Sequence, residues 1–375
     1  MKELYIRNRN GQLEYHIVSC GEPYVKGSFN CSFKTHDIIA AEAKRTDKSL
    51  GYFFSGIGKN EAFCDDNMPK KGTLFPCRIV SLPEGEKTYR ISPVITFTGL
   101  LVHSEFVPDF SRQTIGAKLN VSKKIIPERA DALATYFSDI CENISFNNYS
   151  CSFTLRTLCG DKNIAFETVE KELLGHAERF SGILARFIST LEKTPSPGEV
   201  LYCASAPEYI ISTVKKDDFD RIVTSDPSLS LEFEKTFSVM PSKPAVSSAA
   251  DFDRLFDTVP GLMKFPSCLG RTLYTKSGAR VVYDKTEAMH VFDINSADSS
   301  LDALHVNLEC CETVARAVSV RNLTGIIMCD FINMKSKEEE RQVVDRMREL
   351  AALDYRPFKI HGFTSLKVLE CSRFR

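Results

Sequence analysis

Two aspartates near the end of the chain stand inside apolar stretches and could together bind a metal ion. Asp293 lies in the stretch 289–297, and Asp330 lies in 325–334. Burying a carboxylate alone is strongly unfavourable, so such a group must be paired, hydrogen-bonded or metal-bound. Mg²⁺ prefers one or two carboxylates and keeps several waters, which suits a phosphate substrate. The pair therefore predicts a magnesium site, whereas the plainer interpretation makes each aspartate a turn former or helix cap.

The residues between the two stretches predict an amphipathic helix that could position both aspartates. Apolar residues recur at helical spacing through 302–320. A helix packed on two strands could bring the strand ends into register. Asn295, two residues after Asp293, would lie on the same strand face. The adjacent Cys310 and Cys311 are expected to pack inside this helix.

Several short motifs, taken as a set, resemble the catalytic domain of the ribonuclease E/G family. They are specific together, although Asp-Ile-Asn-Ser alone would be a weak signal. The last third of the chain carries the clearest likeness, and a fainter one runs back to the N-terminus. The motifs lie at 282–288, 293–297, 307–309, 321–332 and 370–373.

This resemblance implies a Mg²⁺-dependent endoribonuclease that cuts single-stranded RNA. Asp293 and Asp330 would bind the metal, and Asn295 would hydrogen-bond the scissile phosphate or the attacking water. Attack by water would leave 5′-phosphate and 3′-hydroxyl ends. The family likeness also implies work in RNA processing, including ribosomal RNA processing, in the cytoplasm.

The fold implied by the resemblance is α+β with several subdomains. Residues 1–34 and 200–268 would form one split domain like ribonuclease H, without its active site. Residues 35–98 would form an inserted S1-like RNA-binding barrel, and 99–199 a region that senses the RNA 5′ end. Residues 269–375 would be the catalytic subdomain, similar to deoxyribonuclease I.

The segment 35–98 has short strands punctuated by Gly, Pro and Asp, which is typical of a small barrel. By resemblance, Phe54 and Phe63 match aromatic residues that stack on RNA bases, and Lys87 matches a basic residue of the same surface. Stacking suits single-stranded RNA because every base has a π-face. The alternative for Phe54 is a place in the barrel core.

Two further stretches resemble RNA-binding motifs of the family, one of which, its Arg-Thr motif, binds the 5′-monophosphate of RNA. Arg156 and Thr157 match its Arg-Thr motif, since a guanidinium fork and a hydroxyl can bind phosphate oxygens. Lys123 and Lys124 replace the two arginines of another motif, and they keep the charge but lose the fork. The alternatives are a surface strand end and a solvated basic loop over 112–129.

Composition narrows the class of protein. The chain has 375 residues, a net charge of −1, 43% hydrophobic residues and 26% charged residues, which is ordinary for a globular protein. RNA affinity must therefore come from local patches. Thirteen scattered cysteines without a Cys-x-x-Cys pair predict reduced thiols in a cytosol. No transmembrane segment or signal peptide is expected.

The remaining pattern gives coarse expectations for other elements. Segment 1–34 predicts two strands, and 166–193 predicts a long amphipathic helix. Residues 193–199 form a Pro-rich break that predicts a linker. The charged segment 337–353 predicts a solvent-facing helix.

Some residues depart from the family pattern. No Cys-Pro-x-Cys zinc link is present, so a zinc-linked tetramer is not expected, while a homodimer through other surfaces stays open. Asn333 replaces an aspartate, and Ser365 and Lys367 replace Arg and Gly. These changes motivate an alternative, a non-catalytic RNA-binding protein that retains the fold. A phosphatase for a small substrate is a third possibility, disfavoured because such a substrate needs no base-stacking barrel.

Overall fold

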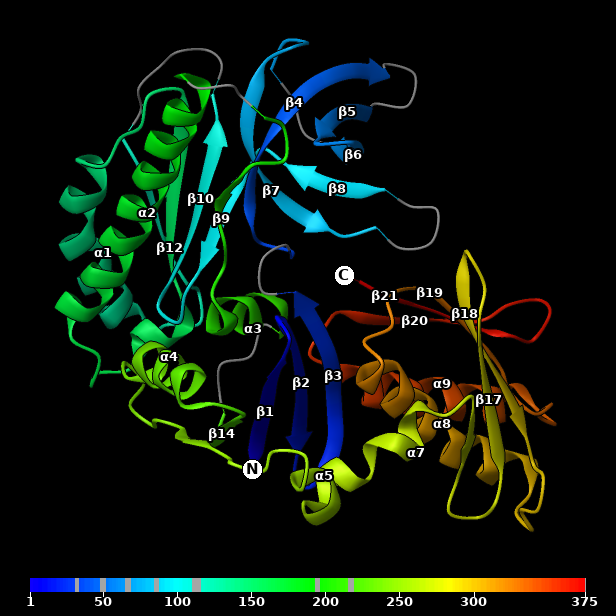
Figure 1. Cartoon of the computed structure of the whole chain (residues 1–375). Coiled ribbons are helices and arrows are strands. Elements are labelled where there is room, and N and C mark those ends of the chain that lie inside the picture. Colours follow the sequence, from blue (N-terminus) through cyan, green and yellow to red (C-terminus); the bar gives the residue numbers. More distant parts are fainter. Residues whose placement is uncertain are drawn as a thin grey trace. The chain divides into compact units, whose positions relative to one another are not determined.

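The computed structural model describes residues 1–30, 34–47, 52–64, 69–83, 88–109, 116–192, 196–214 and 219–374. It divides into two compact units, each assembled from separate chain segments. One unit comprises Met1–Phe29, Val214–Leu231 and Pro244–Arg375, and the other comprises Asn30–Thr213 and Glu232–Lys243. The mixed α+β class expected from the sequence is confirmed (Figure 1). Among the described helices, none combines the length and apolar character needed to cross a membrane.

The first unit begins with a five-stranded sheet in the order β15-β14-β1-β2-β3. Its strands are β1 (Lys2–Arg9), β2 (Gln12–Ser19), β3 (Glu22–Asn30), β14 (Arg221–Thr224) and β15 (Ala245–Ser248). β1 runs antiparallel to β2 and parallel to β14. The N-terminal strands and the later β14 and β15 therefore share one sheet. Helix α4 (Pro227–Phe237) and the short helices α5 (Leu255–Thr258), α6 (Pro260–Met263) and α7 (Phe265–Leu269) follow β14 in the chain.

The prediction of two strands over 1–34 was wrong, because β1, β2 and β3 all form there. Both hairpin turns have two residues with positive φ, at Asn10-Gly11 and at Cys20-Gly21. This backbone twist matches the twist of the flanking strands. Asn-Gly is a recognised signal for such a turn, but Cys20 is not, and the second turn was therefore missed.

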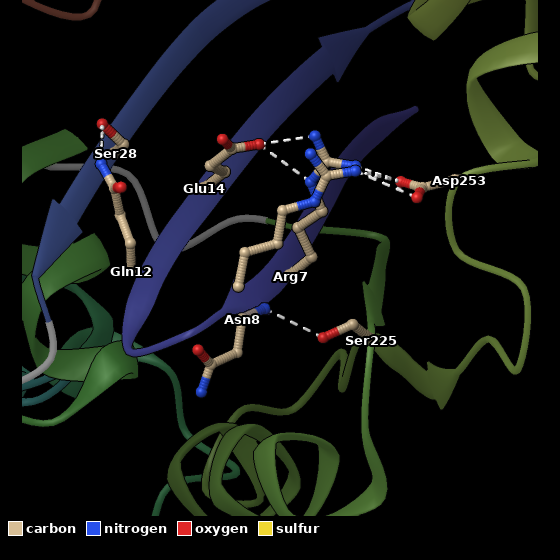
Figure 2. Close-up of polar contacts among 8 residues, drawn as sticks. Arg7, Asn8, Gln12, Glu14, Ser28, Ser225 and Asp253 are labelled. Atoms are coloured by element: carbon tan, nitrogen blue, oxygen red, sulfur yellow. Dashed lines mark hydrogen bonds and ion pairs between the residues drawn. The ribbon is translucent and has the colours of Figure 1, made fainter.

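An ionic cluster joins β1 and β2 to the chain that follows β15 (Figure 2). The Arg7 guanidinium donates to Glu14 Oε2 at 2.8 and 2.6 Å and also pairs with Asp253. The Arg9 guanidinium donates to the same Asp253 at 3.0 Å. The Glu14 carboxylate is thus matched by a cation, and the Arg7 guanidinium helps to lower its pKa, although partial burial opposes this.

Five strands of the described residues in the second unit close into a barrel, in the order β4-β5-β6-β8-β7 with β7 returning to β4. They are β4 (Ile38–Asp47), β5 (Tyr52–Ile57), β6 (Asn60–Cys64), β7 (Leu74–Ser81) and β8 (Tyr89–Ser92). β13 (Val200–Tyr202) extends the sheet beside β4. Small and β-branched side chains such as Ala41, Ala62 and Ile79 fill the core. The small barrel predicted for 35–98 is confirmed.

The second unit also contains a four-stranded sheet in the order β11-β12-β10-β9. Its elements are β9 (Ile95–Thr98), β10 (Val102–Pro108), β11 (Lys118–Val121), α1 (Pro127–Glu142), β12 (Tyr149–Leu155), η1 (Thr157–Gly160), α2 (Phe166–Glu192) and α3 (Ala206–Val214). The long helix expected from residue 166 is confirmed as α2. It packs on the sheet through Phe180, whose ring stacks on Phe106 with centroids 4.0 Å apart.

The first unit ends in a six-stranded sheet in the order β16-β17-β18-β19-β21-β20. Its elements are β16 (Thr272–Tyr274), β17 (Arg280–Lys285), β18 (Met289–Asn295), α8 (Ala303–Val320), β19 (Gly325–Asp330), α9 (Lys337–Ala352), β20 (Phe358–Phe363) and β21 (Leu369–Arg373). The helix predicted over 302–320 is confirmed as α8, which connects the parallel strands β18 and β19. Helices α8 and α9 pack against the sheet (Figure 1).

The C-terminal core explains two sequence expectations. Cys310 and Cys311 on α8 are fully buried, so the expectation that they pack inside is confirmed. Helix α9 forms as predicted but is solvent-facing on one side only. Its other side buries Val343 and Met347 in the same core, because a strongly charged helix can still carry an apolar stripe.

Candidate active site

Asp293 and Asp330 are register partners on neighbouring parallel strands. Partners in such strands point to the same face, and the strands themselves lie about 4.8 Å apart. The flanking residues Phe292, Ile294 and Cys329 turn inward and are buried. Alternation therefore directs both carboxylates away from the core, and both residues are exposed. The sequence placed them in apolar strands correctly, but exposure, not burial, is what leaves these carboxylates available.

Asn295 joins the pair on the same face. Its Nδ2 donates to Asp293 Oδ2 at 2.9 Å, so the amide and the carboxylate hold each other in place. Asn295 is the last residue of β18, and the chain then turns through Ala297, which has a φ of 46°. Asp302 ends this turn as the N-cap of α8, where its carboxylate accepts from His305 N at 3.1 Å.

The two carboxylates fit a magnesium ion better than a metal held wholly by protein. Mg²⁺ commonly takes one or two carboxylates and completes its shell with water and substrate oxygens. Within the described ranges, no three or more His, Cys, Asp or Glu residues gather closely enough to form a metal cage. Asp293 and Asp330 would therefore leave most coordination positions open for water and phosphate.

Three residues from the C-terminal motifs support the site without lying on its open face. Asn307 of α8 is fully buried; its Nδ2 donates to Ile332 O at 2.8 Å, and its Oδ1 accepts from Ile332 N at 3.1 Å. Glu309 accepts from the Ser277 backbone N–H at 3.1 Å. Arg373 is buried and pairs with Asp354 at 2.8 Å. Some residues of these motifs thus make structural contacts, while others provide the exposed aspartates.

Phe54 and Phe63 are register partners on β5 and β6 of the barrel. Their ring centroids lie 6.3 Å apart in an edge-to-face arrangement. Ser55 and Ala62, the next pair, are fully buried. Because side chains alternate along a strand, the two rings face outward, and the core alternative for Phe54 does not fit. Lys87, expected on the same surface, lies outside the described residues.

Sequence reasoning missed two arginines beside these rings. The Arg45 guanidinium lies 4.1 Å from the centre of the Phe54 ring, and its Nη2 is 3.1 Å from Glu61 Oε2. Arg90 is the register partner of Phe63. The row Arg45–Phe54–Phe63–Arg90 thus crosses four strands. Only strand register reveals it, since the residues are spread over 46 positions of chain.

One end of the β11–β12 pair carries Arg156 and Thr157, expected to bind the RNA 5′-phosphate, together with Lys123 and Lys124, expected to bind RNA. These strands are parallel, so Ser122 after β11 and Thr157 after β12 come side by side, with their hydroxyls 3.1 Å apart. Lys123 and Lys124 follow Ser122 and are exposed. Thr157 is exposed, and Arg156 is half-buried beside it.

Arg156 also forms structural hydrogen bonds. Its guanidinium donates to the carbonyl oxygens of Gly99 and Leu100, the latter at 3.3 Å. The half-buried Glu172 carboxylate accepts from the backbone N–H of Leu101 and Val102 at 2.9 and 2.8 Å. Burial raises the pKa of Glu172, and the nearby charge of Arg156 opposes that rise.

Comparison with known proteins adds an independent observation. The model of the ribonuclease E/G family matches residues 111–375. Ribonuclease G of Haemophilus influenzae is 24% identical over 317 residues, covering 82% of this chain and 60% of that protein. Ribonuclease G of Escherichia coli K12 is 32% identical over 127 residues, and its ribonuclease E is 36% identical over 115.

The matches cover less than two thirds of each of these relatives, with 26% of the E. coli ribonuclease G and 11% of the ribonuclease E aligned. The family match nevertheless spans well over half of this chain. It includes both aspartates and the Arg156–Thr157 pair. The chain belongs to the ribonuclease E/G family.

Proposed function

We propose that this chain is an endoribonuclease that hydrolyses single-stranded RNA at Asp293 and Asp330. The observation that carries the proposal is the one-to-one register of the two exposed aspartates on β18 and β19. Family membership supports the same activity, since the relatives are named ribonuclease G and ribonuclease E. We propose that the substrates are RNAs undergoing processing, including ribosomal RNA, and that the enzyme works in the cytoplasm.

Asp293 and Asp330 would hold one Mg²⁺, which when bound supplies an activated water and stabilises charge on the phosphate. Asn295 would orient the scissile phosphate or the attacking water, because Asp293 already fixes its amide. Attack by water instead of the ribose 2′-hydroxyl would leave a 5′-phosphate on one product and a 3′-hydroxyl on the other. The open strand face would admit a polymer without a closed pocket.

The outward row on the barrel supports single-stranded RNA as the substrate class. Phe54 and Phe63 offer aromatic surfaces for bases, and Arg45 beside Phe54 adds positive charge for the backbone. Such surfaces bind bases with little sequence preference. We therefore propose an S1-like role for the closed barrel, with Lys87 contributing to the same surface.

We further propose that Lys123, Lys124, Arg156 and Thr157 bind the 5′-monophosphate of the RNA. Their meeting at one end of β11 and β12 supports this role. The remaining assignments follow the family likeness. The sheet shared by β1–β3, β14 and β15 supports a split ribonuclease H-like domain, and the C-terminal sheet with α8 and α9 supports a deoxyribonuclease I-like subdomain.

Cleavage of a 5′-monophosphorylated, A/U-rich single-stranded RNA, with and without Mg²⁺, tests the proposal. The wild type should cut only with the metal, and Asp293→Asn or Asp330→Asn should abolish cleavage while retaining RNA binding. Asp257→Asn, an exposed position on α5, is the matched control for loss of one charge. Ligation of adaptors that require a 5′-phosphate or a 3′-hydroxyl identifies the product ends.

Two outcomes would overturn parts of this proposal. Wild-type rates in either aspartate variant would show that the site is elsewhere. Tight RNA binding without cleavage under any divalent ion would instead establish the non-catalytic RNA-binding alternative.

A further inference from the structure

The face of the C-terminal sheet that carries Asp293 and Asp330 has a second cross-strand row. Strand register pairs Tyr274 with Arg280 and Arg280 with Asn295. The row Tyr274–Arg280–Asn295 therefore runs across β16, β17 and β18. It lies two residues along from Asp293, or about 6.6 Å at the usual rise of a strand.

Burial fixes the side to which this row points. Leu273, Ala279 and Val281 are buried in the C-terminal core. Tyr274 and Arg280 alternate with them and must face the other way, toward the side of Asp293. Tyr274 is 69% exposed, so its side chain is not packed in the core.

No hydrogen bond, ion pair or ring contact of the described residues accounts for the place of either side chain. Among the described residues, the Arg280 guanidinium has no hydrogen-bond or ion-pair partner, and the Tyr274 ring packs on no other ring. Arg271, a nearby arginine in the same hairpin, is by contrast held by Asp284 at 2.7 Å. Tyr274 and Arg280 thus present a free ring and a free cation beside Asn295.

The chemistry of the row matches one polynucleotide segment. An exposed aromatic ring can stack on a base, and an unpaired guanidinium can bind a phosphodiester through two N–H groups. The Asn295 amide is the next side chain in the row. Adjacent strands are about 4.8 Å apart, so Arg280 lies one strand from Asn295 and Tyr274 lies two. A single strand crossing the sheet at this row would meet amide, cation and ring in turn.

We propose that Tyr274 and Arg280 form a subsite for the nucleotide flanking the scissile bond, in which Tyr274 stacks on the base and Arg280 binds the adjoining phosphodiester. The inference rests on the proposed endoribonuclease function of Asp293 and Asp330. It assigns to the C-terminal subdomain its own base contact, separate from Phe54 and Phe63 on the barrel. The enzyme would therefore require a stackable base at one fixed position from the cut.

The test is a scan of one RNA substrate in which a single reduced abasic nucleotide replaces each residue around the cut in turn. In the wild type, one position should lower kcat/KM about tenfold, the loss expected for one base stack. Tyr274→Ala should lose about tenfold on intact RNA and become indifferent to that position. Tyr274→Phe should behave as the wild type because the ring is retained.

Arg280→Ala should weaken binding and reduce its salt dependence by the equivalent of about one phosphate contact. Arg280→Lys should keep the salt dependence but lose affinity because the fork is missing. Arg341→Ala on α9, whose side chain is 71% exposed, is the matched control for an exposed arginine. Equal melting temperatures would exclude a folding defect as the cause.

A photo-crosslink separates failure of the subsite from failure of the proposed activity. RNA carrying 5-iodouridine at the sensitive position, or at each position in turn if no cutting occurs, should crosslink to Tyr274 in the Asp330→Asn variant. A Tyr274 crosslink without wild-type cleavage would support the subsite and overturn the activity. The subsite would be wrong, and the proposed activity would stand, if the wild type cleaved RNA and Tyr274→Ala kept the wild-type response to each abasic substitution.

Discussion

Asn307, near the N-terminal end of α8, forms two hydrogen bonds with the backbone of Ile332, two residues after Asp330. Its amide nitrogen donates to Ile332 O at 2.8 Å, and its amide oxygen accepts from Ile332 N at 3.1 Å. Asn307 is fully buried. The helix therefore fixes the course of the chain as it leaves the strand end that carries Asp330.

Replacing Asn307 by leucine should destabilise the C-terminal subdomain and loosen Asp330. The change removes both hydrogen bonds to the backbone of the half-buried Ile332, each contributing about 0.5–1.5 kcal/mol. We expect a lower free energy of unfolding and a higher Mg²⁺ concentration for half-maximal cleavage. Denaturant titration and Mg²⁺-dependent rates measure the two effects.

Asn333→Leu is the matched control, because Asn333 lies just beyond Ile332 but is exposed. It should change neither quantity. An unchanged Mg²⁺ dependence in a destabilised Asn307→Leu protein would show that Asn307 supports only the fold.

The sequence predicted the parts of this site that depend on local periodicity. The placing of Asp293 and Asp330 in strands and the helical repeat of α8 both follow from single segments, and a crossover helix between parallel strands brings their ends to one edge. The one-to-one register of the aspartates did not follow from these patterns. A slip of one residue would have turned one carboxylate to the core face.

Contacts between distant segments were beyond local patterns. The row Arg45–Phe54–Phe63–Arg90 depends on how four barrel strands align. Likewise, the third N-terminal strand depends on Cys20 adopting a positive φ, for which the residue type gives no signal.

Phe54→Ala should weaken the binding of single-stranded RNA by about 1–3 kcal/mol, the usual contribution of one base–aromatic stack. Its ring faces outward beside Phe63, so the melting temperature should change little. Fluorescence anisotropy with a labelled oligonucleotide and thermal melting measure the two quantities.

Phe54→Tyr is the control that keeps a ring. Phe75→Ala provides the opposite case, since Phe75 belongs to the barrel core and its loss should lower stability. The outward assignment would fail if Phe54→Ala melted like Phe75→Ala and bound RNA like the wild type.

Arg156→Ala should erase any preference for 5′-monophosphate over 5′-hydroxyl RNA while slow internal cleavage continues. A phosphate monoester carries nearly two charges, and Arg156 with Thr157 offers a fork and a hydroxyl. The variant should also lose stability, because Arg156 donates to the Gly99 and Leu100 carbonyls near the half-buried Glu172. Cleavage rates of the two RNA end types decide the functional part.

Thr157→Val separates sensing from stability. Thr157 is exposed, and among the described residues its hydroxyl hydrogen-bonds to the Ser122 hydroxyl alone, so this variant should lose end preference with little change in stability. Lys123→Ala and Lys124→Ala should weaken binding of 5′-monophosphate RNA more than that of 5′-hydroxyl RNA, because the latter has no terminal phosphate for the lysines to hold. Equal wild-type rates on both ends would mean that the chain has no working 5′ sensor.

His16 should make the first unit sensitive to mild acid. Its ring packs edge-to-face against Phe256 and Phe265, with centroids 4.8 and 4.9 Å away. Burial, with the nearby charges of Lys26 and Arg7, lowers its pKa to about 3. In the unfolded chain His16 takes up its proton near pH 6.5, so its full contribution to the free energy of unfolding is present above pH 6.5. That free energy should fall by about 1.4 kcal/mol per pH unit as the pH drops toward 3.

Denaturant titrations at pH 7.0 and 5.5 test this sign. Between these two pH values the free energy of unfolding of His16→Leu should fall by roughly 1.4 kcal/mol less than that of the wild type, because leucine takes up no proton on unfolding. His361→Leu, at an exposed position on β20, is the control for the loss of one imidazole. His176 on α2, whose pKa burial also lowers to about 3, should give the second unit a similar decline. Equal acid sensitivity in His16→Leu and the wild type would mean that His16 titrates normally in the folded chain.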